Sequence, residues 1–422
     1  MTATLLVLSM FALIAIGMPV AFAMMVSAAG FMAMTGIAMP TLPITMFGGS
    51  ASFVILAVPL FILMGEVMST TSIAERLIDL ARATVGWMRG GLAHVNVVSS
   101  MLMAEMSGSA VADAAVTSKV FVPQMTRAGY PLPFSASVTA SAAIIGIIIP
   151  PSIPMVLFGA VTNTSIRDLF LAGFAPGIAL GLVFIVTNHY FAVKEDHPRD
   201  LAFSRALLKT AFRRAFVPLL IPVVVIGGLI GGIFTPTEAA AIGVVVALLF
   251  GFFMREMTLR KLYPLLVATT HQTGAVLLIV AASAILGQVL ANELIPQKLA
   301  ALLGEAASSQ AMLLLLINVL LLICGMFLQA PAAIIVIIPI LMPIVTTFGI
   351  DPVHFGIVTC VNLAIGQQTP PVATVLMAVC SITKTKMRDT VPYMIWYLVA
   401  MFVVLVVVTY VPLFAPGLIP GL

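Results

Sequence analysis

The chain contains two similar halves. Pro150-Pro151 aligns with Pro370-Pro371 at an offset of 220 residues, and a glycine precedes each pair by the same distance. At this offset the sequence also repeats Met106, Pro123, Gly129 and Val138-Thr139 as Met326, Pro343, Gly349 and Val358-Thr359. Two apolar halves that are interrupted at corresponding points are typical of secondary transporters.

The composition indicates a membrane protein. Hydrophobic residues make up 62% of the chain and charged residues 8%. Soluble domains carry about 25% charged residues, so this chain cannot cover a water-facing surface. Apolar stretches such as 215–234 and 392–413 reach the ~20 residues that a helix needs to cross a bilayer. We therefore predict an all-α polytopic membrane protein. The net charge of +4 does not indicate nucleic-acid binding, because the basic residues lie between the apolar segments rather than on one face.

The apolar segments predict both crossings and hairpins. We expect spans at about 4–38, 51–70, 133–160, 168–193, 215–234, 238–254, 264–292, 353–381 and 392–413. The first of these is too long for one simple crossing, which leaves the side of the N-terminus open. Two further apolar pairs, at about 92–124 and 309–348, have small residues at their centres, and each half is short for a crossing. These pairs are predicted to be re-entrant helical hairpins, each entering and leaving the membrane on one side.

The basic residues predict the orientation of the chain. If the stretch 194–214 is cytoplasmic, every lysine and arginine except Arg167 and Lys298 falls on the cytoplasmic side, as the positive-inside rule expects. The equivalent spans 51–70 and 264–292 are separated by an odd number of crossings, so the two halves are inverted relative to each other. Amphipathic stretches at 73–88 and 295–305 are expected to form arms along the membrane surface.

These observations predict three parts of the chain. Residues 1–193 form a first repeat with a hairpin at about 92–124 and a broken helix at about 133–160. Residues 194–214 form a cytoplasmic linker. Residues 215–422 form a second, inverted repeat with a hairpin at about 309–348 and a broken helix at about 353–381. The predicted fold class is an inverted-repeat, elevator-type transporter with two hairpins and two broken helices.

The hairpin tips and helix breaks are the candidate ion sites. The tips lie at 107–109 and 325–331, and the breaks at 146–152 and 366–371. A break at membrane depth leaves backbone carbonyl groups that protein, water or a bound ion must satisfy. Carbonyl and hydroxyl oxygens suit a hard cation such as Na⁺. The alternative is that these are packing kinks, with small residues for close helix contact, but the fourfold occurrence favours the sites.

Several charged residues lie inside or beside the apolar segments, where they are costly and often functional. Asp113 is expected to support the site, and an ion pair with Lys119 is the alternative. We expect Glu66 and Glu105 to be structural, and Glu238 to cap a helix with Thr235. Helices that begin after Ser109 and Pro151 would direct their positive ends toward the membrane centre, which favours an anionic substrate such as an organic carboxylate.

Six segments of the sequence resemble one transporter family. They are residues 107–115, 150–155, 232–240, 351–356, 362–366 and 369–372. Together they resemble the large membrane subunit of TRAP (tripartite ATP-independent periplasmic) transporters, and the resemblance covers nearly the whole chain. It implies Na⁺-driven uptake of organic acids, such as C4-dicarboxylates or sialic acids, across the bacterial inner membrane. It also implies a periplasmic substrate-binding protein, a separate small four-helix membrane subunit, and an elevator motion of the hairpin domain against a scaffold.

The breaks and the resemblance together give the candidate site residues. The candidate Na⁺ ligands are Ser107, Gly108, Gly146, Pro150, Ser152, Gly325, Gln329, Gly366 and Thr369. The candidate substrate ligands are Ser107, Ser109, Ser152, Gln329, Gln367 and Gln368. Many members of the family carry Asp or Glu where Gln329 stands, and apolar residues where Gln367-Gln368 stands. These differences leave the role of Gln329 open and could mark a substrate subgroup.

The sequence fits two other functional classes less well. An enzyme is not expected, because the sequence has no phosphate-binding loop, no H-E-x-x-H motif and no plausible Ser-His-Asp set. A channel or passive facilitator for small anions is the alternative to a coupled transporter. A channel would need a continuous polar stripe, whereas the polar residues here gather at four breaks.

Overall fold

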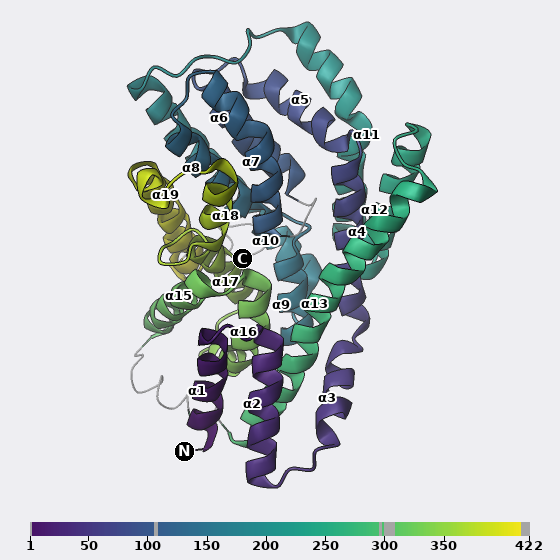
Figure 1. Ribbon diagram of the computed structural model, residues 1–422, viewed down its shortest axis with the longest axis vertical. Coiled ribbons are helices and arrows are strands. Elements are labelled where there is room, and N and C mark those ends of the chain that lie inside the picture. Colours follow the sequence, from purple (N-terminus) through teal and green to yellow (C-terminus); the bar gives the residue numbers. More distant parts are fainter. Residues whose placement is uncertain (1, 105–108, 295–297, 299–308, 415–422) are drawn as a thin grey trace.

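The computed structural model describes residues 2–104, 109–294, 298 and 309–414, and all regular structure among them is helical (Figure 1). Within these residues, eight helical segments are long and apolar enough to cross a membrane. Ser107, Gly108, Glu105 and most of the predicted arm at 295–305 lie outside the described residues.

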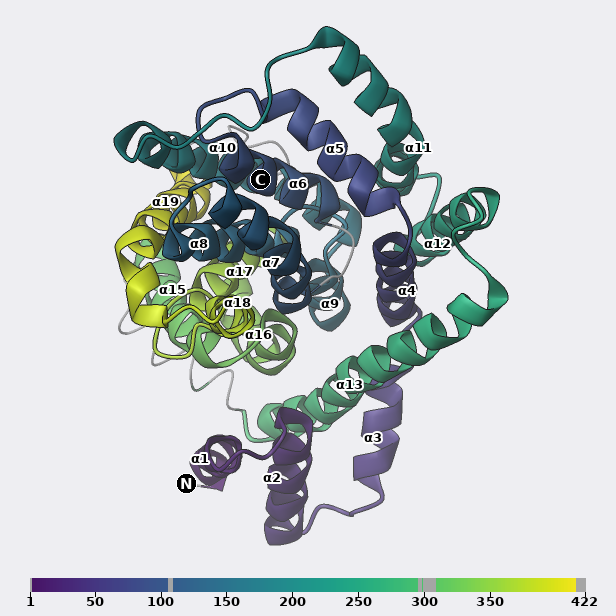
Figure 2. The ribbon, with the colours of Figure 1, turned by 45° about the horizontal axis from the view of Figure 1, so that its top comes forward.

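The helices pack into two groups, and each group contains helices from both halves of the sequence (Figure 2). The first, called here the scaffold group, contains α1 (Thr2–Ala15), α2 (Val20–Thr35), α3 (Thr41–Ser50), α4 (Ala57–Thr70), α11 (Arg205–Ile230), α12 (Pro236–Phe253) and α13 (Leu259–Asn292). In the scaffold group α13 packs against α2, α3 and α4, and α12 packs against α4 and α11.

The second group, called here the hairpin group, contains the predicted hairpins and broken helices. It comprises α6 (Gly91–Met103), α7 (Ala110–Arg127), α8 (Leu132–Ala143), α9 (Ile153–Thr162), α10 (Ile166–Lys194), α15 (Gln310–Phe327), α16 (Ala330–Thr347), α17 (Pro352–Gly366), α18 (Thr374–Thr383) and α19 (Met387–Phe414). Helices from both halves of the sequence pack together here, since α16 contacts α9 and α18 contacts α7. The α13 helix of the scaffold group packs on α16.

The predicted hairpins and broken helices are confirmed. Helices α6 and α7 form the first hairpin, and α15 and α16 form the second. The first broken helix consists of α8, a 3₁₀ turn η2 (Ile144–Ile147) and α9, and the second of α17 and α18. Proline blocks helix at both breaks because it lacks an N–H group. Both Pro-Pro bonds, Pro150-Pro151 and Pro370-Pro371, are cis.

The ends of several helices follow from local sequence. The apolar stretch 4–38, which is too long for one simple crossing, forms two helices, because Gly17 adopts a φ of +95° and Pro19 follows it. The predicted cap at α12 is confirmed: Thr235 and Glu238 form a capping box in which Thr235 N donates to Glu238 Oε2 at 2.8 Å. The η1 turn (Phe53–Leu56) leads directly into α4.

The α5 helix (Ile73–Val85) connects the two groups as the amphipathic arm predicted at 73–88. Its apolar face is buried against α11 and α6. At its start, Ser72 N donates to Glu256 Oε2 at 2.7 Å, and Arg76 lies 3.9 Å from the same carboxylate. Near its end, Arg82 Nε donates to Asp200 Oδ2 at 3.0 Å, in the segment that follows α10. Polar contacts therefore tie α5 to the scaffold group at one end and to the hairpin group at the other.

The division of the chain into a first repeat (1–193), a linker (194–214) and a second repeat (215–422) stays a prediction. In the structure α10 ends at Lys194 and α11 begins at Arg205. The segment between them lies against the hairpin group, since Gly90 N donates to Pro198 O at 3.1 Å and Asp200 N donates to Gly86 O at 3.0 Å.

Candidate functional site

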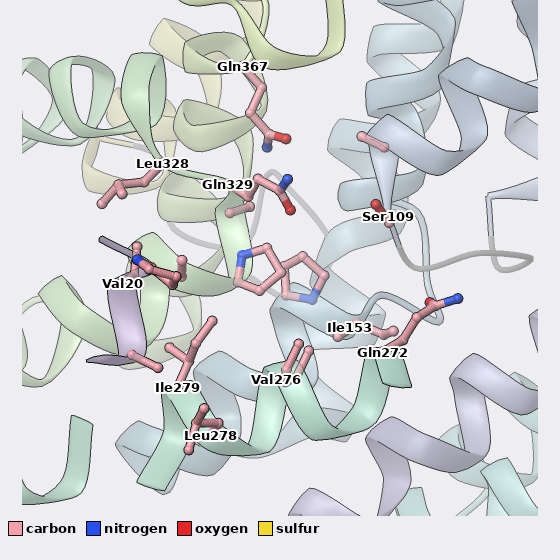
Figure 3. Close-up of a pocket in the computed structure, with 18 of the residues that line it drawn as sticks. Val20, Ser109, Ile153, Gln272, Val276, Leu278, Ile279, Leu328, Gln329 and Gln367 are labelled. Carbon is pink, nitrogen blue, oxygen red and sulfur yellow. The ribbon is translucent and has the colours of Figure 1, made fainter. Parts of the chain in front are cut away.

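A cavity of about 580 Å³ lies between the hairpin group and the scaffold group (Figure 3). Its walls come from the start of α2, the middle of α13, the first break, the start of α7 and the second hairpin tip. Four polar side chains line it: Ser109, Gln272, Gln329 and Gln367. Among the described residues that line it, none carries a formal charge.

Three helix N-termini line this cavity. The α7 helix begins at Ala110, with the Ser109 hydroxyl accepting a hydrogen bond from Ala112 N at 3.4 Å. The α9 helix begins at Ile153 and is capped by Ser152, and α16 begins at Ala330 after Gln329. The N-terminus of a helix carries partial positive charge and unpaired N–H groups. An uncharged cavity with three such ends is therefore suited to an anion.

The first break packs against the first hairpin. A methyl group on Gly146 would lie 3.1 Å from the Ala104 carbonyl oxygen and 3.1 Å from Asp113 Oδ2. The buried Ser152 hydroxyl donates to Ile147 O at 2.5 Å, across the break. Gly146, Pro150 and Ser152 are all buried. The structure thus brings the break next to the end of α6 and to Asp113, while Ser152 lies beneath the cavity wall rather than in it.

The second break packs against the second hairpin tip in the same way. A methyl group on Gly366 would lie 2.6 Å from Gly325 Cα, so the two backbones touch. The Thr369 hydroxyl donates to Ile365 O at 2.8 Å. Gln329 is exposed at the start of α16 and lines the cavity.

The neighbouring glutamines Gln367 and Gln368 point to different places. Gln367 faces the cavity on the same side as Gln329, and Ser109 lies on the other side (Figure 3). Gln368 is buried away from the cavity, and its amide donates to Ala140 O. Of the candidate substrate ligands, the cavity therefore brings together Ser109, Gln329 and Gln367, but not Ser152 or Gln368.

The oxygens around the second break suit a hard cation. The Gln368 Oε1 and Thr374 Oγ1 atoms are buried without a hydrogen-bond partner among the described residues. Buried polar atoms normally have partners, so two orphaned oxygens at one break fit a bound ion or water. No group of three His, Cys, Asp or Glu side chains that could hold a metal occurs in the described part of the chain.

Among the polar residues of the cavity, Gln272 was not predicted from the sequence. This glutamine lies in the predicted span 264–292, and its Nε2 atom donates to Glu66 Oε1 of α4 at 2.6 Å. A polar residue within an apolar run was its only signal. The scaffold residues Val20, Val276 and Ile279, which also line the cavity, carry no signal of a site at all.

The sequence matches the family described as the DctM component of the tripartite ATP-independent periplasmic transporter over residues 7–414. The chain belongs to this family. It is a multi-pass membrane protein and a transporter permease, and the predictions of the family and of a non-enzymatic protein are confirmed.

Several relatives are large permeases of such TRAP transporters. The sialic acid TRAP transporter large permease protein SiaM of Vibrio cholerae is 39% identical over 367 residues, which is 86% of each chain. The C4-dicarboxylate protein DctM of Pseudomonas aeruginosa is 39% identical over 352 residues, 83% of this chain and 82% of the relative. The 2,3-diketo-L-gulonate protein YiaN of Escherichia coli is 35% identical over 391 residues, 92% of each.

A solved structure shares the fold. The YdaH transporter of Alcanivorax borkumensis superposes with a TM-score of 0.64 and 16% identity, covering 89% of this chain and 88% of that one. This likeness confirms the fold class predicted for this TRAP permease, and it bears on the fold alone.

Proposed function

We propose that this chain is the permease subunit of a Na⁺-coupled importer of an organic acid in the bacterial inner membrane. It works with a small four-helix membrane subunit and receives its substrate from a periplasmic binding protein. The observation that carries the proposal is the uncharged cavity of about 580 Å³, bounded by both hairpins and lined by three helix N-termini.

The substrate carboxylate would lie at the N-termini of α7, α9 and α16. Their N–H groups and dipoles stabilise negative charge without a lysine or arginine in the cavity. The relatives named above are called permeases for sialic acid, C4-dicarboxylate and 2,3-diketo-L-gulonate, which are all carboxylic acids. An organic acid is the substrate class that is common to these names and suits the cavity.

Two Na⁺ ions would lie where the hairpin tips meet the breaks. The first site would use Ser107, Gly108 and the break that contains Gly146, Pro150 and Ser152. The second would use the tip from Gly325 to Gln329, and the break from Gly366 to Thr369. Gln368 Oε1 and Thr374 Oγ1, which are buried without a hydrogen-bond partner among the described residues, would be further ligands for the second ion. Na⁺ at these places would fix the positions of the helix N-termini that bind the substrate, which couples the two binding events.

An elevator motion would carry the cavity across the membrane. The substrate residues Ser109, Gln329 and Gln367 belong to the hairpin group, whereas the facing wall belongs to the scaffold group. If the hairpin group slides along α13, the same ligands can face either side of the membrane in turn. The α5 arm, anchored by Glu256 on the scaffold and by Asp200 on the hairpin group, would carry this movement.

Uptake into proteoliposomes tests the proposal. The complex of this chain with its small subunit and binding protein is reconstituted, and radiolabelled sialic acid, gluconate and succinate are offered with and without an inward Na⁺ gradient. We expect at least one acid to accumulate above its external concentration, and a Na⁺ ionophore to abolish the accumulation. Flux of an acid that stops at equilibrium and ignores the gradient would instead show a passive facilitator.

A further inference from the structure

The scaffold side of the cavity offers one polar side chain. Helices α2, α4 and α13 contribute apolar residues such as Val20, Ile62 and Val276. Among the described scaffold residues that line the cavity, only Gln272 is polar. A polar group that stands alone on an apolar wall can select one part of a ligand, because a mismatched group there would be left without a hydrogen bond.

Glu66 fixes the direction of this amide. Gln272 Nε2 donates to Glu66 Oε1 at 2.6 Å, from a neighbouring helix of the same group. The amide nitrogen is the donor in this hydrogen bond, so the NH₂ side of the amide faces Glu66. The carbonyl oxygen and the second N–H of Gln272 then remain for a ligand. These two functions, one acceptor and one donor, match a hydroxyl group, which can both donate and accept.

The other polar groups of the cavity have the same character. Gln329 and Gln367 are neutral amides, and Ser109 is a hydroxyl. A second carboxylate at the scaffold side would meet no cation among the described lining residues, and it would lie near the carboxyl group of Glu66. The cavity is therefore built for one negative group, at the helix N-termini, and for several neutral hydrogen-bonding groups elsewhere.

We propose that the cavity takes a polyhydroxylated monocarboxylate, such as a sugar-derived acid, in preference to a simple dicarboxylate. Gln272 is the specificity-determining residue that binds a substrate hydroxyl, and Glu66 is the positioning residue that orients it. This inference rests on the proposed function and narrows its substrate.

The chain supplies a matched control on the same helix. Gly65-Glu66-Val67 aligns with Gly287-Gln288-Val289 in the sequence repeat. Gln288 Oε1 accepts a hydrogen bond from Thr45 Oγ1 at 2.6 Å, so it too joins α13 to another scaffold helix. Gln288 does not line the cavity. Gln288→Ala therefore removes a comparable scaffold contact without touching the proposed substrate site.

Ligand-induced thermal stabilisation tests the specificity. The purified complex of this chain with its small subunit is heated in Na⁺ buffer with D-gluconate or with succinate, at equal ionic strength and without the binding protein. A ligand that binds only the folded protein raises its melting temperature in proportion to RT ln(1 + [L]/Kd). We expect D-gluconate to raise the melting temperature more than succinate.

The variants then assign the roles. Loss of one hydrogen bond predicts that Gln272→Ala weakens D-gluconate binding about tenfold and leaves succinate unchanged. Glu66→Gln keeps an acceptor but lets either end of its amide face Gln272, so it should weaken D-gluconate binding by less than Glu66→Ala does. Gln288→Ala should leave the binding of both acids unchanged. Stronger stabilisation by succinate, or equal D-gluconate affinity of Gln272→Ala and wild type, would overturn this inference while leaving an organic-acid transporter. No response to either acid would also overturn this inference, whereas the proposed function is tested separately by the uptake assay, which includes sialic acid.

Discussion

The contact between Gly325 and Gly366 gives a sharp test of how the second hairpin tip is held. These glycines bring the end of α15 and the end of α17 into backbone contact, at the place where the second Na⁺ would bind. A Cβ atom on Gly366 would lie 2.6 Å from both Gly325 Cα and the Gly325 carbonyl carbon. Gly366→Ala is therefore expected to push the tip away from the break.

The size of the effect follows from the distances. Ordinary carbon contacts begin near 3.4 Å, so the two helix ends must separate by about 0.8 Å. No side chain can rotate away, because both partners are backbone. Overpacking of this kind lowers the free energy of unfolding by about 1–3 kcal/mol. The better helix propensity of alanine offsets at most ~1 kcal/mol of this loss. We expect a net loss of about 1–2 kcal/mol in the free energy of unfolding, together with weaker Na⁺ binding.

The other glycines provide graded comparisons. Gly146→Ala at the first break meets the Asp113 carboxylate and the Ala104 carbonyl oxygen at 3.1 Å, which requires a shift of only a few tenths of an ångström. Gly227→Ala in α11 meets nothing within 4 Å. Thermal unfolding of the purified proteins over a Na⁺ titration should rank Gly366→Ala below Gly146→Ala and Gly227→Ala in melting temperature. If Gly366→Ala is as stable and as Na⁺-responsive as Gly227→Ala, the tip and break do not touch as described.

Two further predictions concern Ser152 and the segment after α10. Ser152→Ala removes the cap of α9 and the hydrogen bond across the first break, so it should reduce Na⁺-dependent uptake. Ser204→Ala removes the cap of α11 and should leave uptake unchanged. Equal uptake in both variants would contradict a role of Ser152 at the first Na⁺ site. Burial against the Tyr130 ring, 4.5 Å between centroids, lowers the pKa of His197 below 6.5 although Glu195 opposes the shift. The folded protein thus binds fewer protons than the unfolded chain, so stability is complete above about pH 6.5 and falls as the pH decreases through the folded pKa. His197→Phe should flatten this decline in melting temperature, and an unchanged slope would show that other groups cause it.

The sequence predicted those features that depend on backbone chemistry. Proline pairs, glycines and the apolar pattern located both broken helices and both hairpins, because these residue types restrict what the backbone can form at that point. The cap at Glu238 was equally local, since a Thr-Pro-Thr-Glu run carries its own hydrogen-bonding partners. Long apolar runs were weaker guides: the length of the stretch 4–38 showed that it was too long for one crossing, but not where its two helices divide.

The facing wall of the cavity could not be predicted because it depends on how helices pack. Gln272 and Glu66 lie 206 residues apart, and their hydrogen bond requires α13 to cross α4 at one register. Neighbouring residues were equally hard to separate. Gln367 and Gln368 are identical residue types in the turn that follows α17, yet Gln367 lines the cavity and Gln368 donates to Ala140 O. The sequence therefore predicted the positions of segments better than the directions of single side chains.

The two halves share the same arrangement of hairpin and broken helix, but they contribute differently to the cavity between the hairpin group and the scaffold group. In both halves a glycine of the break packs on the end of the hairpin's first helix, at Gly146 and at Gly366. The first break is buried, whereas Pro370 and Pro371 of the second are exposed. The α9 helix directs its N-terminus to the cavity wall, but α18, which starts after Ala373 in a left-handed conformation with φ of +50°, does not line it. A symmetric pair of breaks would direct positive ends at two places. The asymmetric pair brings three N-termini to one cavity, where the proposed anion would bind, and leaves the oxygens of the second break for the proposed Na⁺.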